Sequence, residues 1–327
     1  MRQRRIRNDS RPTYYHLIGR VAGTRDDRPF DDVDRRKFVG LLRELASFYT
    51  IDIIDFVVMS NHYHIVVCAD HQLPAPAVAV ERFNAYYQNK VPPQRLPLPL
   101  TVDHPDLESV QRRLRDISCL AKDLQQRFTS WYNRTRRPEP RRGTLWESRF
   151  KSVVLEGRHA WDSAVWNCVK YIALNPVRAH IVEDPADYRF SSWGMLCGSG
   201  CHPFAASFFK HMRIILGPAA AALADDELVG RLRADMAATI AAERGADRAA
   251  AEAVYDQARQ PDATWLRFCR RTRYWSDGAI IGTKSFVVET AAFWRDAAWA
   301  QQHRCAKTRL ANGQFLTVLR NLRRSLE

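Results

Sequence analysis

The sequence predicts an α+β fold, with a ferredoxin-like antiparallel sheet carrying helices on one face and a mainly α-helical C-terminal extension. Two observations lead to this prediction. Strand-like and helix-like patterns follow each other in the order β-α-β-β over residues 13–68, which is half of a ferredoxin-like sheet. Farther along, residues 219–258 are rich in alanine, the strongest helix former.

The β-α-β-β opening is defined by its apolar residues. Phe38, Leu41 and Leu45 recur at helical spacing, whereas Val, Ile and Phe dominate the stretches before and after Asn61. Asn61 is a residue that turns readily accommodate. The expected elements are a strand at 13–22, a helix at 31–49 and strands at 51–59 and 62–68.

The middle of the chain adds helices, loops and a fourth strand. Proline disfavours helical geometry in the residue before it, so Pro176 is expected to end a helix. Glycines cluster near residue 200, and we therefore place a boundary there between two domains, 1–200 and 201–327. The further expected elements are helices at 79–87, 107–134 and 159–174 and a strand at 149–155.

Composition narrows the class of protein. The chain has 327 residues, 46% of them hydrophobic, and no apolar run near the roughly 20 residues of a membrane span. The arginines near the N-terminus are not followed by an apolar segment, so no secretory signal is expected. Seven scattered cysteines favour reduced thiols. We expect a cytoplasmic, nucleoid-associated protein.

The charge balance favours a polyanionic partner. Fifty Lys and Arg against 36 Asp and Glu give a net charge of +14. Nearly all of the basic residues are arginines, which bind phosphate in a bidentate manner and stack on bases. An arginine-rich soluble protein from a GC-rich genome is the alternative, but local clustering of the charge favours nucleic acid.

His62 and His64 are the most informative pair of residues. On a strand, residues two apart project from the same face, so the two imidazoles are expected side by side, with Tyr63 pointing away. Neutral imidazoles are ligands for divalent metals. Taken alone, the pair is as compatible with two structural histidines as with a metal site.

Tyr171 and Asn175 form a second, distant pair. Residues four apart on a helix share a face, so an amide oxygen and a phenol are expected to point the same way. Asn175 would then be a third metal ligand beside a tyrosine nucleophile that attacks phosphorus. From the helix pattern alone, a buried tyrosine with Asn175 as a C-cap is the simpler interpretation. Tyr63 and Tyr132 are rival nucleophiles.

A basic stretch with interleaved aromatics predicts contact with single-stranded nucleic acid. Cationic groups neutralise phosphates and aromatic rings stack on bases. A solvated helix face with core aromatics is the alternative, and the loop at 134–142 is the segment most expected to contact DNA. The predicted DNA-binding residues are Arg4, Arg5, Arg134, Arg136, Arg137, Arg141, Arg142, Arg149 and Lys151.

Several segments together resemble one family. They are Tyr14–Leu17, Val58–Val67, Gly143–Lys151, Tyr171–Ala179 and Asp187–Ser192. Their order and spacing resemble the HUH-type single-tyrosine transposases, and within them the REP-associated tyrosine transposases. The resemblance covers residues 12–195. The residues after about 200 exceed the compact members of the family, and a DNA-contacting role or a packing role for them is equally open.

The resemblance implies an HUH nuclease domain, with His62 and His64 as ligands of Mg²⁺ or Mn²⁺, Tyr171 as nucleophile and Asn175 as a further polar ligand. It implies cleavage and joining of single-stranded DNA at hairpins through a 5′-phosphotyrosine, by a monomer or homodimer. A catalytically inactive, domesticated hairpin-binding protein is the main alternative. A metal phosphodiesterase acting without a covalent intermediate is a weaker one.

Overall fold

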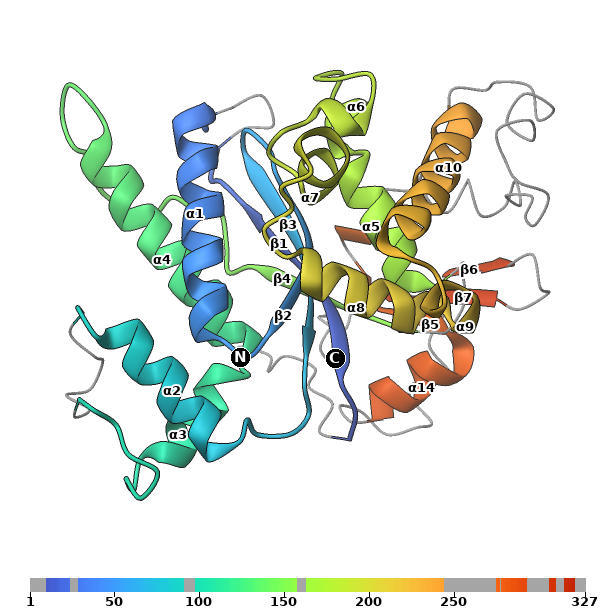
Figure 1. Ribbon diagram of the computed structural model, residues 1–327. Coiled ribbons are helices and arrows are strands. Elements are labelled where there is room, and N and C mark those ends of the chain that lie inside the picture. Colours follow the sequence, from blue (N-terminus) through green and yellow to red (C-terminus); the bar gives the residue numbers. More distant parts are fainter. Residues whose placement is uncertain are drawn as a thin grey trace, which may run out of the picture.

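The described strands form one mixed sheet. The computed structural model describes residues 10–23, 29–90, 98–157, 163–243, 275–276, 278–292, 306–309 and 315–320. Seven strands lie in the order β2-β3-β1-β4-β5-β7-β6 (Figure 1). Their bounds are β1 (Thr13–Arg20), β2 (Asp52–Val58), β3 (His62–Ala69), β4 (Lys151–Leu155), β5 (Gly278–Thr283), β6 (Ala306–Arg309) and β7 (Phe315–Arg320).

The first four strands have the predicted arrangement. Each pairs with its neighbour in an antiparallel manner, and the spatial order β2-β3-β1-β4 is that of a ferredoxin-like sheet. The α+β class is therefore confirmed. The prediction of a purely antiparallel sheet is wrong, because β5 pairs with β4 in a parallel manner and extends the sheet with β7 and β6.

Two helices cover the first face of the sheet. Helix α1 (Asp32–Phe48) begins with a capping box, in which the Asp31 side chain accepts from the Asp34 amide and the reverse bond is also present. Helix α4 (Ile117–Thr135) lies beside α1, and Phe38 and Phe128 meet at a ring-centroid distance of 5.3 Å. We call this the α1/α4 face.

Tyr63 fills the centre of the α1/α4 face. Its ring lies 4.8 Å from that of Phe38 and 5.5 Å from that of Trp146, measured between centroids. The residue opposite it on β1 is Gly19, where an added Cβ would lie 2.2 Å from the Tyr63 ring. A glycine within the strand thus makes room for a large aromatic side chain of its neighbour.

The second face carries helices as well, so the prediction of helices on one face is wrong for the whole molecule. It holds for α1 and α4 only, which connect the first four strands. Helix α5 (Ala164–Ala173) lies against the opposite face together with α8 (Ala205–Leu216), and α10 (Asp225–Glu243) lies outside α5 (Figure 1). We call this the α5/α8 face.

The ends of two predicted helices have local causes. The predicted helix at 107–134 is two helices, α3 (Leu107–Leu114) and α4, because Asp116 caps a new N-terminus by accepting from the Ser118 amide. The expected end of the helix before Pro176 is confirmed, since helix α5 ends at Ala173, and Pro176 occupies the first turn of a new short helix, α6 (Asn175–Arg178), where its missing N–H costs nothing.

The part of the chain after residue 200 contains more strand than predicted. Residues 201–243 are mainly helical, as expected, but β5, β6 and β7 follow and join the sheet of the first domain. The helical prediction for 244–258 lies outside the described residues. The remaining helical elements are α2 (Pro76–Tyr87), the 3-10 turn Pro185–Asp187, α7 (Ser192–Gly194), the π-helical turn Met195–Ser199, α9 (Pro218–Ala221) and α14 (Lys284–Ala292).

The helices and cysteines of the described residues bear on the compositional predictions. None of their helices combines the length and apolarity that a membrane span requires. The five cysteines that the structure describes are free thiols, as predicted: Cys68, Cys119, Cys168, Cys197 and Cys201.

Candidate active site

Strand β3 presents His62 and His64 on the α5/α8 face. Their ring centroids lie 5.1 Å apart with planes at 86°. Tyr63 points to the opposite face, as predicted, because side chains alternate along a strand. β3 lies between β2 and β1, so the pair sits in the middle of the ferredoxin-like part of the sheet.

Helix α5 brings Tyr171 to the histidines. The Tyr171 ring meets that of His64 edge-on at a centroid distance of 5.6 Å, across more than a hundred residues of sequence. Ser163 caps the helix by accepting from the Trp166 amide, and every residue of α5 is buried. The spatial proximity on which the predicted site depends is therefore present, and Tyr171 is itself only 4% exposed.

Asn175 lies on the same side as Tyr171, at the start of α6. Its Nδ2 donates to the backbone carbonyl of Tyr171 at 3.0 Å. Its side chain also forms a hydrogen bond with the ring of His62. The amide thus connects the end of α5 to the imidazole pair, and Tyr171, Asn175, His62 and His64 form one cluster.

A third histidine belongs to this cluster and was not predicted. His16 on β1 is fully buried, and its Nε2 lies 2.8 Å from Nδ1 of His64. The other ring nitrogen, Nδ1, lies 3.1 Å from the carbonyl oxygen of Trp275. His16 was part of a recognised motif, but only the register of β1 against β3 shows that it lies diagonally across from His64.

Burial keeps the three imidazoles uncharged. Desolvation lowers the pKa of His16 to about 3, despite the hydrogen bond to Trp275. Desolvation, with the nearby positive charge of Arg20, lowers the pKa of His62 to about 4. The pKa of His64 also lies well below its ordinary value, through desolvation and the neighbouring histidines. Neutral imidazoles retain a lone pair, which metal binding requires.

Cationic side chains surround the cluster. Arg20 is paired with His62 across the β1–β3 ladder, and Lys151 is paired with Ile18, so both belong to the histidine face. The guanidinium of Arg178 lies 5.3 Å from the centre of the Tyr171 ring and donates to the Tyr171 carbonyl at 3.1 Å. Of these cations only Lys151 was predicted. Arg20 is identified by its pairing with His62 in the strand register. Arg178 is identified by its contacts from α6 with Tyr171 of α5.

The predicted DNA-binding residues other than Lys151, which lies half-buried on the histidine face, fall into three groups. Arg4 and Arg5 lie outside the described residues. Arg136 is half-buried and is used within the fold. The third group consists of exposed arginines in the loop after α4 and just before β4, namely Arg134, Arg137, Arg141, Arg142 and Arg149. Their exposure leaves the guanidinium groups accessible, as the predicted phosphate contact requires.

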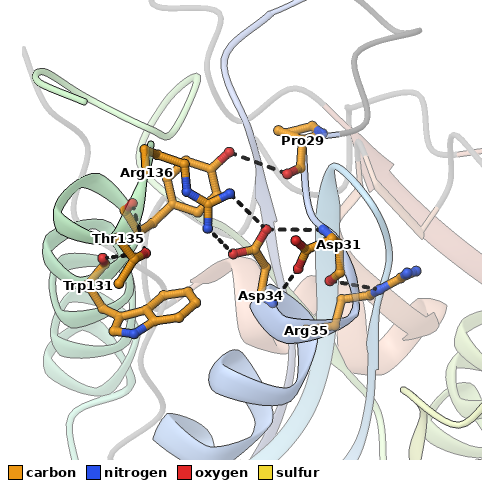
Figure 2. A network of polar contacts seen from close by, with 8 residues as sticks. Pro29, Asp31, Asp34, Arg35, Trp131, Thr135 and Arg136 are labelled. Atoms are coloured by element: carbon orange, nitrogen blue, oxygen red, sulfur yellow. Dashed lines mark hydrogen bonds and ion pairs between the residues drawn. The ribbon is translucent and has the colours of Figure 1, made fainter. Parts of the chain in front are cut away.

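Arg136 pairs with a buried carboxylate and ties the end of α4 to the start of α1. Figure 2 shows its guanidinium facing Asp34, whose side chain is fully buried. The same guanidinium lies 3.9 Å from the centre of the Tyr132 ring. This arginine therefore stabilises the packing of two helices, and its contact with DNA stays a prediction.

The rival nucleophiles lie away from the imidazoles. Tyr63 is enclosed on the α1/α4 face. Tyr132 lies on α4, where its hydroxyl donates to the Pro29 carbonyl at 3.3 Å. Among these tyrosines, Tyr171 is the one whose ring contacts the histidine cluster.

The cluster has the chemistry of an open, incomplete metal site. In the described part of the chain, no three His, Cys, Asp or Glu side chains gather in a metal-binding arrangement. His62, His64 and the Asn175 amide would supply up to three neutral donors to a divalent ion, as the sequence predicts. The Nδ1 atoms of the two histidines are already hydrogen-bonded within the protein. His64 Nδ1 bonds to His16, and His62 Nδ1 bonds to Asn61 at 2.7 Å. This is the support that metal-binding histidines use.

Comparisons with known proteins give a distant match. No family model matches the chain, and no curated protein matches it. One solved structure does, described as a REP-associated tyrosine transposase bound to a REP hairpin. The identity is 16% and the TM-score 0.38, over 62% of this chain and 90% of that one. At this identity and TM-score the similarity is remote.

Proposed function

We propose that this protein is a metal-dependent single-stranded DNA endonuclease and strand transferase that acts through a covalent phosphotyrosine. The observation that carries the proposal is the contact between Tyr171 and His64, the neighbour of His62, from segments far apart in the sequence. The site combines a phenol with neutral imidazoles and an amide, and arginine and lysine side chains lie on the same face. This combination suits phosphodiester transfer. The motif resemblance and the net positive charge agree with a DNA substrate.

The proposed reaction is the one that the motif resemblance implies, carried out by Tyr171. The Tyr171 oxygen attacks the phosphorus of a phosphodiester, the new O–P bond replaces the P–O3′ bond, and the phenolic proton goes to water while the departing 3′ oxygen takes up one. The products are a 5′-phosphotyrosine and a free 3′-hydroxyl. Because one phosphoester replaces another, the reverse attack by a 3′-hydroxyl joins strands without an external energy source.

The surrounding residues position the phosphate. Bound Mg²⁺ or Mn²⁺ would polarise the scissile phosphate and offset its developing charge. His62, His64 and Asn175 would hold that ion. Arg20 and Lys151, on the same face of the sheet, are placed to attract the phosphate backbone.

The DNA on either side has two candidate contact regions. The exposed arginines of the 134–142 loop offer phosphate contacts. A cavity of about 680 Å³ lies against α6 and is lined by Leu174, Val177 and Arg178 among others, directly after the nucleophile helix. Its lining mixes apolar side chains with Arg178, His180 and Glu183, and the Arg178 guanidinium there suits a nucleotide phosphate.

A matched pair of tyrosine variants tests the proposal. The full chain is incubated with Mn²⁺ and labelled single-stranded DNA that carries an imperfect hairpin, and covalent adducts are separated on a denaturing gel. Tyr171→Phe removes the attacking oxygen and should abolish the adduct while retaining DNA binding. Tyr132→Phe makes the same chemical change away from the cluster and should leave adduct formation intact. Equal adduct yield from Tyr171→Phe and wild type would refute the assignment.

A hairpin-binding protein without catalysis is the second candidate. It is favoured by the burial of Tyr171, whose ring also stacks on Trp275 at 5.8 Å with an interplanar angle of 21°. A phenol so enclosed must be uncovered before it meets a phosphate. In the same gel assay, retention of the hairpin without any adduct, under conditions in which Mn²⁺ is bound, would support this candidate over the first.

A further inference from the structure

His16 lies between a backbone carbonyl and a predicted metal ligand. A carbonyl oxygen only accepts hydrogen bonds, so the 3.1 Å contact with Trp275 requires His16 Nδ1 to carry the proton. No carboxylate faces the fully buried His16 ring in the described surroundings, so the ring is neutral and its Nε2 is an acceptor.

The direction of the second hydrogen bond follows from the first. Since His16 Nε2 accepts, His64 Nδ1 must donate across the 2.8 Å contact. The neutral His64 ring then carries no proton on Nε2. Its lone pair is therefore directed to the side of the ring remote from His16. A carbonyl-to-imidazole-to-imidazole chain thus selects the tautomer of His64.

We propose that His16 is a positioning residue that fixes the ring orientation and Nδ1–H tautomer of His64, with the C-terminal extension supplying the acceptor at the end of the chain through Trp275. The inference rests on the proposed function insofar as His64 is a metal ligand. The arrangement is the type in which a ligating histidine donates its other N–H to a second group, with an imidazole here in place of the usual carboxylate or carbonyl.

The geometry distinguishes a positioning role from a ligand role for His16. Both of its ring nitrogens are committed, one to Trp275 and one to His64. Its ring also lies nearly parallel to that of His64, at 4.9 Å and 27°, and edge-on to Tyr171 at 6.1 Å. Packing on two sides and hydrogen bonds at both nitrogens hold the ring in one orientation.

The inference gives the C-terminal extension a part in the site. The Trp275 carbonyl fixes His16, while the Trp275 ring stacks on Tyr171. Asp235 of α10 accepts from both Trp166 and Lys170 of α5, each at 2.6 Å. The residues after 200 therefore support both halves of the cluster, the imidazoles and the helix that carries the phenol.

The first test needs neither metal nor DNA. Nitrogen NMR of the full chain with labelled histidines reports which ring nitrogen of His64 is protonated, the signal being assigned by its loss in His64→Gln. The expected result is the Nδ1–H tautomer in wild type and its loss in His16→Phe. An Nε2–H tautomer of His64 in wild type would overturn the relay whatever the fate of the proposed reaction.

The second test measures Mn²⁺ affinity by calorimetry on the full chain without DNA. His16→Phe keeps the ring volume, removes both hydrogen bonds and should weaken Mn²⁺ binding by about 10–100-fold. His16→Gln retains one donor and one acceptor and should restore part of the affinity. Tyr14→Phe is the matched control, because Tyr14 is a buried neighbour on the same face that contacts His211 at 3.0 Å. Its Mn²⁺ affinity should equal that of wild type.

The outcomes separate the alternatives. Unchanged Mn²⁺ affinity in His16→Phe would contradict a positioning role. Complete loss of binding, equal to that of His64→Gln, would make His16 a ligand and would also contradict it. Wild-type Mn²⁺ binding and an intact relay without any DNA adduct would refute the proposed reaction while supporting the inference.

Discussion

The two faces of the sheet are built from the same strands and differ in what they bury. The α1/α4 face is filled by apolar and aromatic side chains such as Tyr63, Phe38 and Phe128. The α5/α8 face buries polar groups, including His16, His64 and Asp55. Both faces are closed by helices, so solvent access does not account for the difference. Burial of apolar side chains on the α1/α4 face stabilises the fold, and this offsets the free-energy cost of burying polar groups on the α5/α8 face.

The difference follows from the alternation of side chains along a strand. In β3, Tyr63 and Ile65 project to one face and His62 and His64 to the other. Residues adjacent in the sequence can therefore serve different functions, one in the packing of the core and the next in the candidate active site. Substitutions on the α1/α4 face should therefore mainly lower the free energy of unfolding, and those on the α5/α8 face mainly the rate of adduct formation. The predictions below are ordered by the size of these changes.

The largest effect is expected on the α5/α8 face. His64→Gln keeps much of the side-chain volume but removes a ring nitrogen from the proposed ion. Loss of several kcal/mol of charge stabilisation corresponds to a fall of roughly 10²–10³-fold in the rate of adduct formation. The thermal midpoint should change little in comparison. A variant with a normal rate of adduct formation would show that the imidazole pair is not part of the chemistry.

The neighbouring residue on the α1/α4 face should behave in the opposite way. Tyr63→Ala leaves a cavity against Phe38 and Trp146 and should lower the free energy of unfolding by about 3–5 kcal/mol. Denaturant titration gives this value. Per molecule of folded protein, the rate of adduct formation should remain that of wild type. A selective loss of that rate would mean that the two faces are not functionally separate.

Two adjacent arginines sharpen the comparison between fold and DNA contact. Arg136→Ala leaves the buried Asp34 carboxylate without its partner and should cost about 2 kcal/mol of stability. Arg137→Ala changes an exposed side chain and should leave stability unchanged while weakening hairpin binding and reducing its salt dependence. Unfolding curves and binding at two salt concentrations measure both. The reverse pattern would contradict these assignments.

The remaining prediction lies outside this order because it concerns pH dependence, and its subject is Asp55, a buried carboxyl on the α5/α8 face. Desolvation raises its pKa to about 8, despite hydrogen bonds from Ser192 and the Phe56 backbone. Between about pH 4 and 8 the folded protein keeps a proton that the unfolded chain releases, so stability falls as pH rises, by up to about 1.4 kcal/mol per pH unit. Asp55→Asn removes this ionisation.

The stability advantage of Asp55→Asn over wild type should therefore increase from pH 5 to pH 8. Thermal unfolding at several pH values across this range measures it. An advantage that stays constant with pH would show that the folded carboxyl titrates normally.

The sequence predicted what depends on local periodicity and missed what depends on register. The alternation in His62-Tyr63-His64 was sufficient to assign the two faces. The diagonal contact of His16 with His64 required the pairing of β1 with β3, which no local pattern specifies. The proximity of Tyr171 to the imidazoles was expected through the motif resemblance, and periodicity alone could not have placed the two segments together.

The errors have similar causes. The second layer of helices was missed because hydrophobic periodicity shows that a helix has an apolar face but does not show which side of a sheet that face covers. Arg136 was grouped with its neighbours in a basic loop, since a buried partner 102 residues away leaves no local trace. The parallel strand β5 was missed because short strands in the C-terminal region carry little pattern.

The central claim is that the phenol of Tyr171 meets DNA phosphorus at the imidazole cluster. The most direct measurement is mass spectrometry of the protein after reaction with hairpin-bearing single-stranded DNA and Mn²⁺, followed by nuclease and trypsin digestion. Cleavage after Lys170 and Arg178 releases the peptide Tyr171–Arg178. The account predicts that this peptide carries a nucleotide on its tyrosine. A nucleotide on any other residue, or none on protein that has bound both Mn²⁺ and the hairpin, would contradict it.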